Sequence, residues 1–260
     1  MSGQEAAGVA FRPLFVFGGF VMRRIAAFIS ALVITLMVTL VSGCALSVPE
    51  GFNEVKRAKE LYDKLDSGRL TMTDLSSGET LMEFSFFINA KDEMIFSYLS
   101  QDESGTEGAY SDGAQFFYKN RGEEKWRIIS TEDESYLYNL YSRTYRYPYA
   151  RGSVFFLDGT SVGAAQVTEN ADGSLTVSYE YDPEKLNKNA VGMLDGVSEF
   201  YALSAVYEIA ADGCIAAFTE TGSVADEQGG RSDVNIRLEV SDPNGVCDIP
   251  SPVGELAEVM

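Results

Sequence analysis

The sequence of 260 residues contains no histidine, one tryptophan and three cysteines. The lack of histidine excludes Ser-His-Asp and Cys-His hydrolases and histidine-ligated zinc sites, because these sites use imidazole as a base or as a ligand. Lysine and arginine are also scarce, at 20 against 39 aspartate and glutamate residues, and the formal net charge is −19. Nucleic-acid binding needs clustered cations that neutralise phosphates, so no nucleic-acid partner is expected.

Other patterns of catalysis and metal binding are missing as well. The sequence has no C-x-x-C pair, no serine three residues before a lysine and no twelve-residue EF-hand loop. Residues 159–163 match the G-x-S-x-G nucleophile elbow, but that motif needs a parallel α/β sheet and a histidine. Acidic pairs such as Asp102 and Glu103 are interpreted as solvated surface. We therefore expect a protein that is not an enzyme, with no cofactor and no metal site.

The N-terminal segment has the architecture of a secretory signal. Residues 25–41 are apolar and uncharged, follow Arg23 and Arg24, and lead into Val41-Ser42-Gly43-Cys44. This ending resembles the lipobox of bacterial lipoproteins, in which the cysteine thiol takes a diacylglycerol, the peptide is cut before it and the new amine is often acylated. A plain transmembrane anchor is the alternative, although the run is slightly short for a spanning helix, which needs about 20 residues.

The lipobox resemblance divides the chain at Cys44. Residues 1–43 are expected to be a signal peptide, residues 44–51 a lipidated tether, and residues 52–260 a single domain. Because Met22 directly precedes Arg23 and Arg24, residues 1–21 are interpreted as an over-extended start. Two or more acyl chains such as palmitate anchor a protein stably. The expected location is extracytoplasmic, on the outer face of the cytoplasmic membrane, with the membrane as a partner through the anchor.

The mature chain reads as one helix followed by many strands. Residues 52–66 carry apolar side chains at three- and four-residue spacing, which predicts an amphipathic helix. Period-two patterns then predict about ten strands, interrupted by a short helix at 135–143 and by a helix at 183–194. Asp172-Gly173 and Asp212-Gly213 predict tight hairpins. The fold class is therefore α+β: a single large, curved antiparallel sheet, an open half-barrel, covered by two or three helices.

This order of elements resembles the LolA/LppX-type lipoprotein-carrier superfamily. The resemblance lies in the lipobox, the opening amphipathic helix, the strands broken by a helical insertion, and the closing Cys247-Asp248-Ile249-Pro250-Ser251-Pro252, over about residues 52–252. It implies an open half-barrel with a helical lid that holds acyl chains in its cavity. The pocket of that family is a diffuse apolar lining, so the resemblance does not assign a binding role to any individual residue of this sequence.

Two alternating sets of side chains in the first long strand are candidates for such a lining. One set is Leu81, Glu83, Ser85 and Phe87; the other is uniformly apolar and must face inward, and it consists of Met82, Phe84, Phe86 and Ile88. Six tyrosines between residues 136 and 149 could form the rim of a cavity, and Tyr138 and Tyr141 are the candidates among them. We expect an apolar or lipid ligand here. The alternative is a structural or protein-interaction lipoprotein with a fully packed core and no ligand.

The two remaining cysteines, Cys214 and Cys247, are exported to an oxidising compartment. If the strands at 214–221 and 233–240 pair as a hairpin, both cysteines lie at its open end. A disulfide between them is expected, with two unpaired thiols as the alternative. A Cα separation beyond about 7 Å would exclude the bond.

Overall fold

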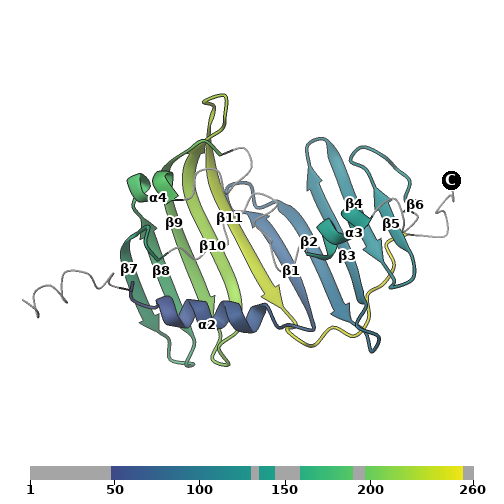
Figure 1. The fold of residues 1–260 in the computed structure, drawn as a ribbon, viewed down its shortest axis with the longest axis horizontal. Helices are drawn as coiled ribbons and strands as arrows, with labels where there is room; N and C mark the ends of the chain where they lie inside the picture. Colours follow the sequence, from purple (N-terminus) through teal and green to yellow (C-terminus); the bar gives the residue numbers. More distant parts are fainter. Residues whose placement is uncertain (1–47, 130–134, 144–158, 190–196, 254–260) are drawn as a thin grey trace, which may run out of the picture. The chain divides into compact units, whose positions relative to one another are not determined.

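The computed structural model describes residues 48–129, 135–143, 159–189 and 197–253 of the chain. Within these residues eleven β-strands form one antiparallel sheet, and three helices accompany it (Figure 1). The strand order is β6-β5-β4-β3-β2-β1-β11-β10-β9-β8-β7, so β6 and β7 are the two edges and the sheet is open. The single open antiparallel sheet with a few helices, predicted from the sequence, is therefore confirmed.

The sheet consists of two runs of consecutive strands joined by a long-range pairing of β1 with β11. In the register of this pair, Leu70 lies opposite Val240 and Met72 opposite Leu238. The first run contains β1 (Ser67–Asp74), β2 (Thr80–Ile88), β3 (Met94–Asp102), β4 (Gly105–Ser111), β5 (Phe116–Lys119) and β6 (Arg127–Ile129). The second run contains β7 (Val162–Glu169), β8 (Leu175–Tyr181), β9 (Glu199–Ile209), β10 (Ile215–Ala225) and β11 (Arg231–Ser241).

Tight turns at the two Asp-Gly pairs connect strands of the second run, as the sequence predicts. Gly173 and Gly213 have φ angles of 81° and 89°, a backbone conformation that glycine adopts without steric cost. Asp172 and Asp212 accept hydrogen bonds from the backbone N–H two residues on, at 3.0 and 2.9 Å. These turns join β7 to β8 and β9 to β10, and so fix the register of both hairpins.

The helices are α2 (Phe52–Tyr62), α3 (Ser135–Ser142) and α4 (Pro183–Asn189). α2 ends four residues before the predicted boundary, because the N–H groups of Lys64 and Leu65 turn back to carbonyls only three residues earlier. α4 begins as predicted, since the Asp182 carboxylate accepts the N–H groups of the second and third helical residues. The predicted end of this helix at residue 194 lies outside the described residues.

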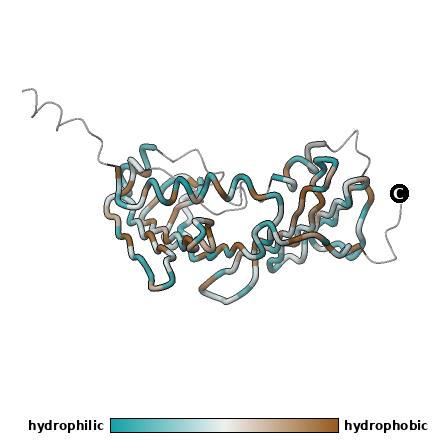
Figure 2. Tube along the Cα trace, turned by 90° about the horizontal axis from the view of Figure 1, so that it is seen from below, coloured by the Kyte–Doolittle hydropathy of each residue, from teal (hydrophilic) through white to brown (hydrophobic). Residues whose placement is uncertain are grey.

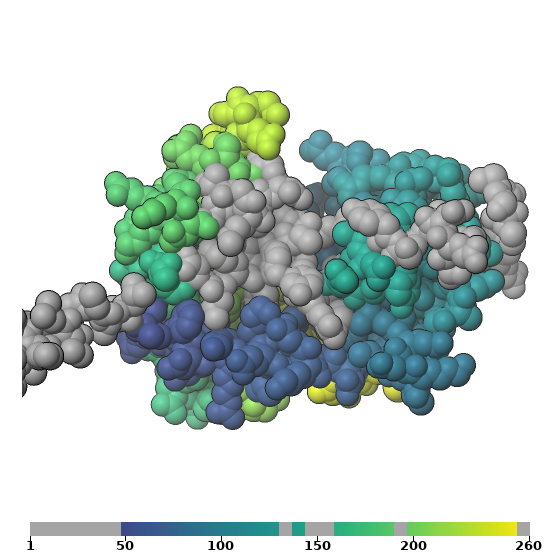
Figure 3. Space-filling model, in the orientation of Figure 1, coloured from purple at the N-terminus to yellow at the C-terminus, as the bar shows by residue number. Residues whose placement is uncertain are grey.

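The helices contact one face of the sheet, which we call the helix face. α2 lies against β9 and β10, α4 against β9, and α3 against β3. Figure 2 shows α2 on one side of the strand layer, and in Figure 3 both α2 and α3 are on the side toward the viewer. A Cβ atom on Gly51 would lie 2.7 Å from Val167 and from Val177, so the backbone at the start of α2 sits directly on β7 and β8.

The main hydrophobic core fills the space between the helix face and the helices. It combines Val55, Ala58 and Tyr62 of α2 with inward side chains of the strands. Among the largest fully buried side chains are Phe84, Phe86, Phe96, Tyr98, Tyr141, Tyr179, Tyr207 and Phe218. The core is therefore strongly aromatic.

A second, smaller hydrophobic cluster lies on the opposite side of the sheet. It joins Tyr110 of β4 and Phe117 of β5 to three side chains that follow β11, namely Val246, Ile249 and Val253. We call residues 242–253 the strap, and the side of the sheet that it covers the strap face. The first part of the strap is bonded to β1: the N–H groups of Asn244 and Val246 donate hydrogen bonds to Ser67, at 2.8 and 3.1 Å. The Ile-Pro ending of the sequence thus closes the strap face.

Candidate ligand-facing surface

The predicted lining of β2 lies on the helix face. Met82, Phe84 and Phe86 are 2%, 1% and 0% exposed, whereas Ile88, at the end of the strand, is half-buried. The prediction that the uniformly apolar set faces inward is therefore confirmed for these positions. That they contact a ligand stays a prediction.

The register of the strands extends this lining across the sheet. Phe84 lies opposite Leu70 of β1 and Tyr98 of β3, and Phe86 lies opposite Phe96 of β3. The Phe84 ring stacks on Phe96 with 5.7 Å between the ring centroids. Because residues directly opposite one another share a face, each row forms a continuous apolar strip that runs perpendicular to the strands.

α3 places two of the predicted tyrosines over this strip. The Tyr138 ring packs against Phe96 and edge-on against Phe116, at centroid distances of 5.8 and 5.9 Å. The Tyr141 ring packs against Tyr98 at 4.9 Å. Burial, together with the nearby charge of Glu93, raises the pKa of Tyr138. Tyr138 and Tyr141 thus join the aromatic surface, whereas Tyr145, Tyr147, Tyr149 and the side chain of Tyr136 lie outside the described residues.

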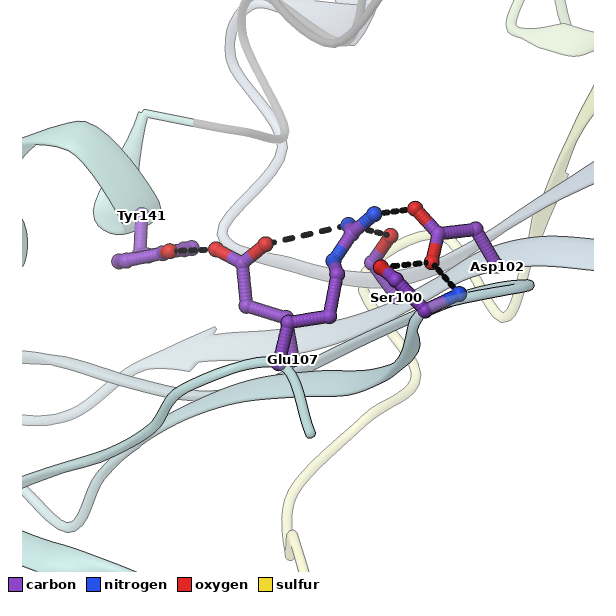
Figure 4. A network of polar contacts seen from close by, with 6 residues as sticks. Ser100, Asp102, Glu107 and Tyr141 are labelled. Atoms are coloured by element: carbon purple, nitrogen blue, oxygen red, sulfur yellow. Dashed lines mark hydrogen bonds and ion pairs between the residues drawn. The ribbon is translucent and has the colours of Figure 1, made fainter. Parts of the chain in front are cut away.

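A polar network attaches α3 to the sheet (Figure 4). The Tyr141 hydroxyl donates a hydrogen bond to the Glu107 carboxylate of β4, which also receives a hydrogen bond from Arg121 at 3.2 Å. Arg121 in turn pairs with Asp102 and donates to Ser100 Oγ at 3.3 Å. Sequence reasoning missed this network. The one feature of the sequence that indicates such a network is Glu107, an acidic residue at an inward position of a strand.

Three tyrosines and a glutamate form a second polar group on the helix face, at the other end of the sheet. The members are Tyr179 and Tyr181 of β8, Tyr207 of β9 and Glu220 of β10, and all four are buried. We call this group the polar centre. Tyr207 shares a hydrogen bond with Tyr181 and is influenced by the charge of Glu220, and burial raises its pKa well above the ordinary value. Sequence reasoning missed this group as well.

The opposite side of the same strands is polar. The Arg237 guanidinium of β11 binds both carboxylate oxygens of Glu208 of β9, at 2.6 and 3.0 Å. This hydrogen bonding lowers the pKa of Glu208. Arg237 also donates to Thr219 Oγ1 of β10 at 3.1 Å. The contrast between the two sides identifies the helix face as the apolar one in this half of the sheet.

The expected disulfide is not formed, since Cys214 and Cys247 are both free thiols. Cys214 directly precedes β10, whereas Cys247 follows Val246, whose N–H is bonded to Ser67 of β1. β11 lies between β10 and β1, and neighbouring strands are about 4.8 Å apart, so the two cysteines are separated by roughly 10 Å. A disulfide needs a Cα separation under about 7 Å. The prediction was wrong because the chain crosses β1 after β11 instead of turning back toward β10.

Neither a metal cluster nor a membrane-spanning helix is found in the part of the chain that the structure describes. No three His, Cys, Asp or Glu side chains there are grouped so that they could hold a metal ion. None of the helices within the same residues is both long enough and apolar enough to cross a bilayer.

Two solved structures resemble this fold. LprF from Mycobacterium bovis is 13% identical, with a TM-score of 0.43, over 79% of this chain and 98% of that one. The Mycobacterium tuberculosis lipoprotein LppX is 15% identical, with a TM-score of 0.41, over 76% of this chain and 97% of that one. No protein-family model matches the sequence, and no curated protein is similar to it. The resemblance that the sequence indicates is to LppX-type lipoproteins, and LppX is one of these two structures.

Proposed function

We propose that the mature chain is a lipoprotein that is attached to the outer face of the cytoplasmic membrane through Cys44 and binds an apolar or lipid ligand on its helix face, without catalysing a reaction. The observation that carries the binding proposal is the aromatic surface formed by Phe84, Phe96 and Tyr98 together with Tyr138 and Tyr141 of α3. The surface belongs to β2, β3 and α3, which is the part of the chain where the sequence predicts a lining.

The arrangement of the helices supports this proposal. α2 and α4 contact the sheet mainly at β9 and β10, and α3 contacts it at β3, β4 and β5. Between these places the helix face continues through β11, β1 and β2 with Leu238, Leu70, Met72 and Met82. The strap face, by contrast, has a small cluster that the chain's own C-terminal segment packs.

The proposed mechanism is sequestration of an acyl chain between the sheet and the helices. Removal of apolar surface from water contributes roughly 25 cal/mol per Å². Aromatic side chains add contact area with little loss of conformational freedom, since each has only two rotatable bonds. A lipid could therefore bind without any group that reacts with it.

Attachment at Cys44 is tested by growing cells that express the chain with labelled palmitate. The expected result is a labelled protein whose label disappears in Cys44→Ser. An unlabelled wild-type protein would contradict the anchor and, with it, the proposed location.

Ligand binding is tested by native mass spectrometry of the full mature chain released from detergent after incubation with cell lipids. We expect bound acyl lipid on the wild type and less of it on Tyr138→Ala, because Tyr138 packs on the aromatic surface. Tyr201→Ala is the matched control, since Tyr201 is 40% exposed and contacts Arg231 instead. A lipid-free mass for the wild type, under conditions that preserve lipid on a known carrier, would contradict the proposal.

The second candidate function is that of a structural or interaction lipoprotein. It is favoured by the near-complete burial of the inward side chains of β2, which is also what a core packed only by its own residues would show. The lipid-free mass described above is the result that this alternative predicts.

A further inference from the structure

The polar centre holds a buried hydroxyl group that has no hydrogen-bond partner among the described residues. The side chain of Tyr179 is 1% exposed, and in the described part of the chain its Oη has no hydrogen-bond partner. Buried hydroxyl groups in proteins are almost always hydrogen-bonded, because leaving one without a partner costs the free energy of its desolvation. An unpaired hydroxyl at this depth therefore points to a partner that is not part of the chain.

The strand register places a small residue beside this hydroxyl. Tyr179 of β8 lies opposite Ala205 of β9, and Ala205 lies opposite Glu220 of β10. The three side chains thus form one row on the helix face, with a phenol at one end, a carboxyl group at the other and only a methyl group between them. Glu220 is fully buried. A small polar group could sit over Ala205 and reach both ends of the row.

The hydrogen-bonding capacity of Tyr179 and Glu220 indicates which class of polar group would bind there. The pKa of Tyr179 is raised to about 12, mainly by burial and also by the charge of Glu54, so its hydroxyl remains a hydrogen-bond donor at physiological pH. The carboxyl group of Glu220 can accept a hydrogen bond. The inward residues of β8, β9 and β10 include Glu220 but neither lysine nor arginine, so an anionic headgroup finds no counter-charge on these strands.

We infer that the polar centre binds the headgroup of a neutral lipid that carries a free hydroxyl, of the diacylglycerol or long-chain alcohol class. The lipid oxygen accepts a hydrogen bond from Tyr179 Oη, and the lipid O–H donates a hydrogen bond to a carboxyl oxygen of Glu220. The acyl chains extend along the helix face toward β1 and β2. This inference rests on the proposed function and adds to it the class of ligand and the residue that recognises the headgroup.

The test compares three photoreactive, clickable probes with identical acyl chains: a diacylglycerol, its 3-methyl ether and the corresponding phosphatidic acid. Each is irradiated with the full chain in membranes, and label is quantified on peptides from residues 48–253. The wild type should be labelled about tenfold more by the diacylglycerol than by the other two probes, which is the factor expected for one or two well-placed hydrogen bonds. Equal labelling by all three would overturn the inference and leave the proposed function intact, whereas no labelling by any would contradict both.

Variants identify the residues that are responsible. Tyr179→Phe should lower labelling by the diacylglycerol several-fold, because the lipid oxygen then loses the hydrogen bond from Tyr179. Tyr201→Phe, the same change at an exposed site, should leave that labelling unchanged. Tyr179→Phe removes a buried hydroxyl without a partner, so we expect it to fold at least as stably as the wild type. Ala205→Val, which adds two methyl groups between Tyr179 and Glu220, should also lower labelling by the diacylglycerol. A preference for phosphatidic acid, or diacylglycerol labelling that Tyr179→Phe leaves unchanged, would overturn the inference.

Discussion

The hydroxyl of Tyr141 donates a hydrogen bond to the carboxylate of Glu107 and thereby joins α3 to β4. Tyr141 is 2% exposed, so removal of its hydroxyl leaves a largely buried carboxylate with one partner fewer. We predict that Tyr141→Phe lowers the free energy of unfolding by about 1.5–3 kcal/mol, the usual range for a hydrogen bond to a charged group. Urea denaturation measures this loss, and amide exchange should quicken in α3.

The control for this prediction is Tyr138→Phe on the same helix. Among the described residues, the Tyr138 hydroxyl reaches only the backbone carbonyl of Met94, at 3.5 Å, so its removal should cost less than about 1 kcal/mol. Equal losses for the two variants would show that the link to Glu107 does not hold α3.

We predict that loosening the packing of the strap changes tryptophan fluorescence, and that truncation on the helix face does not. Trp126 is the only tryptophan, and it packs with the cluster that Ile249 closes on the strap face. Ile249→Ala should cost about 2–5 kcal/mol and shift tryptophan emission to longer wavelength, because water gains access to the cluster. Met82→Ala, a truncation on the helix face, should destabilise the protein without that shift in the folded state. An unchanged spectrum for Ile249→Ala would contradict the packing of the strap.

The two free thiols should differ in reactivity. Burial and the neighbouring Asp212 raise the pKa of Cys214, so less of it is thiolate near neutral pH, whereas Cys247 is exposed. Both cysteines should react with a thiol reagent before any reducing agent is added, and Cys247 should react faster. A protein that reacts only after reduction would contradict this account and show that the two cysteines form a disulfide.

We predict that ionisation of the Tyr179 hydroxyl destabilises the protein at high pH. Its pKa is raised from 10.0 to about 12, so its contribution is fully present below pH 10 and is lost as the pH rises through about 12. A shift of this size corresponds to at most about 3 kcal/mol. Tyr179→Phe should therefore lose less stability than the wild type between pH 8 and pH 12, measured by urea denaturation at each pH. Parallel pH profiles for the two proteins would contradict the burial of this hydroxyl.

Local patterns in the sequence were sufficient to predict most of the fold. The Asp-Gly turns and the Asp182 cap are decided by residues that lie within a few positions of one another. The inward side of β2 follows from alternation alone, because only one of its two sets is uniformly apolar.

The features that the sequence did not predict depend on long-range contacts. The pairing of β1 with β11 carries the strap across β1, and this path separates Cys214 from Cys247. The polar centre arises because the register places Tyr179, Ala205 and Glu220 in one row across three strands. No pattern within a single strand specifies such a row.

The most direct test of the proposed lipid binding is to map where an acyl chain lies. A fatty-acid ester with a photoreactive group at the chain end is cross-linked to the full chain in membranes, and the modified residues are identified by peptide sequencing in a mass spectrometer. Cross-links on β2, β3 and α3, at side chains such as Phe84, Tyr98 and Tyr138, are the predicted result. Cross-links confined to the strap face or to the residues around Val48, with none on the helix face, would contradict it.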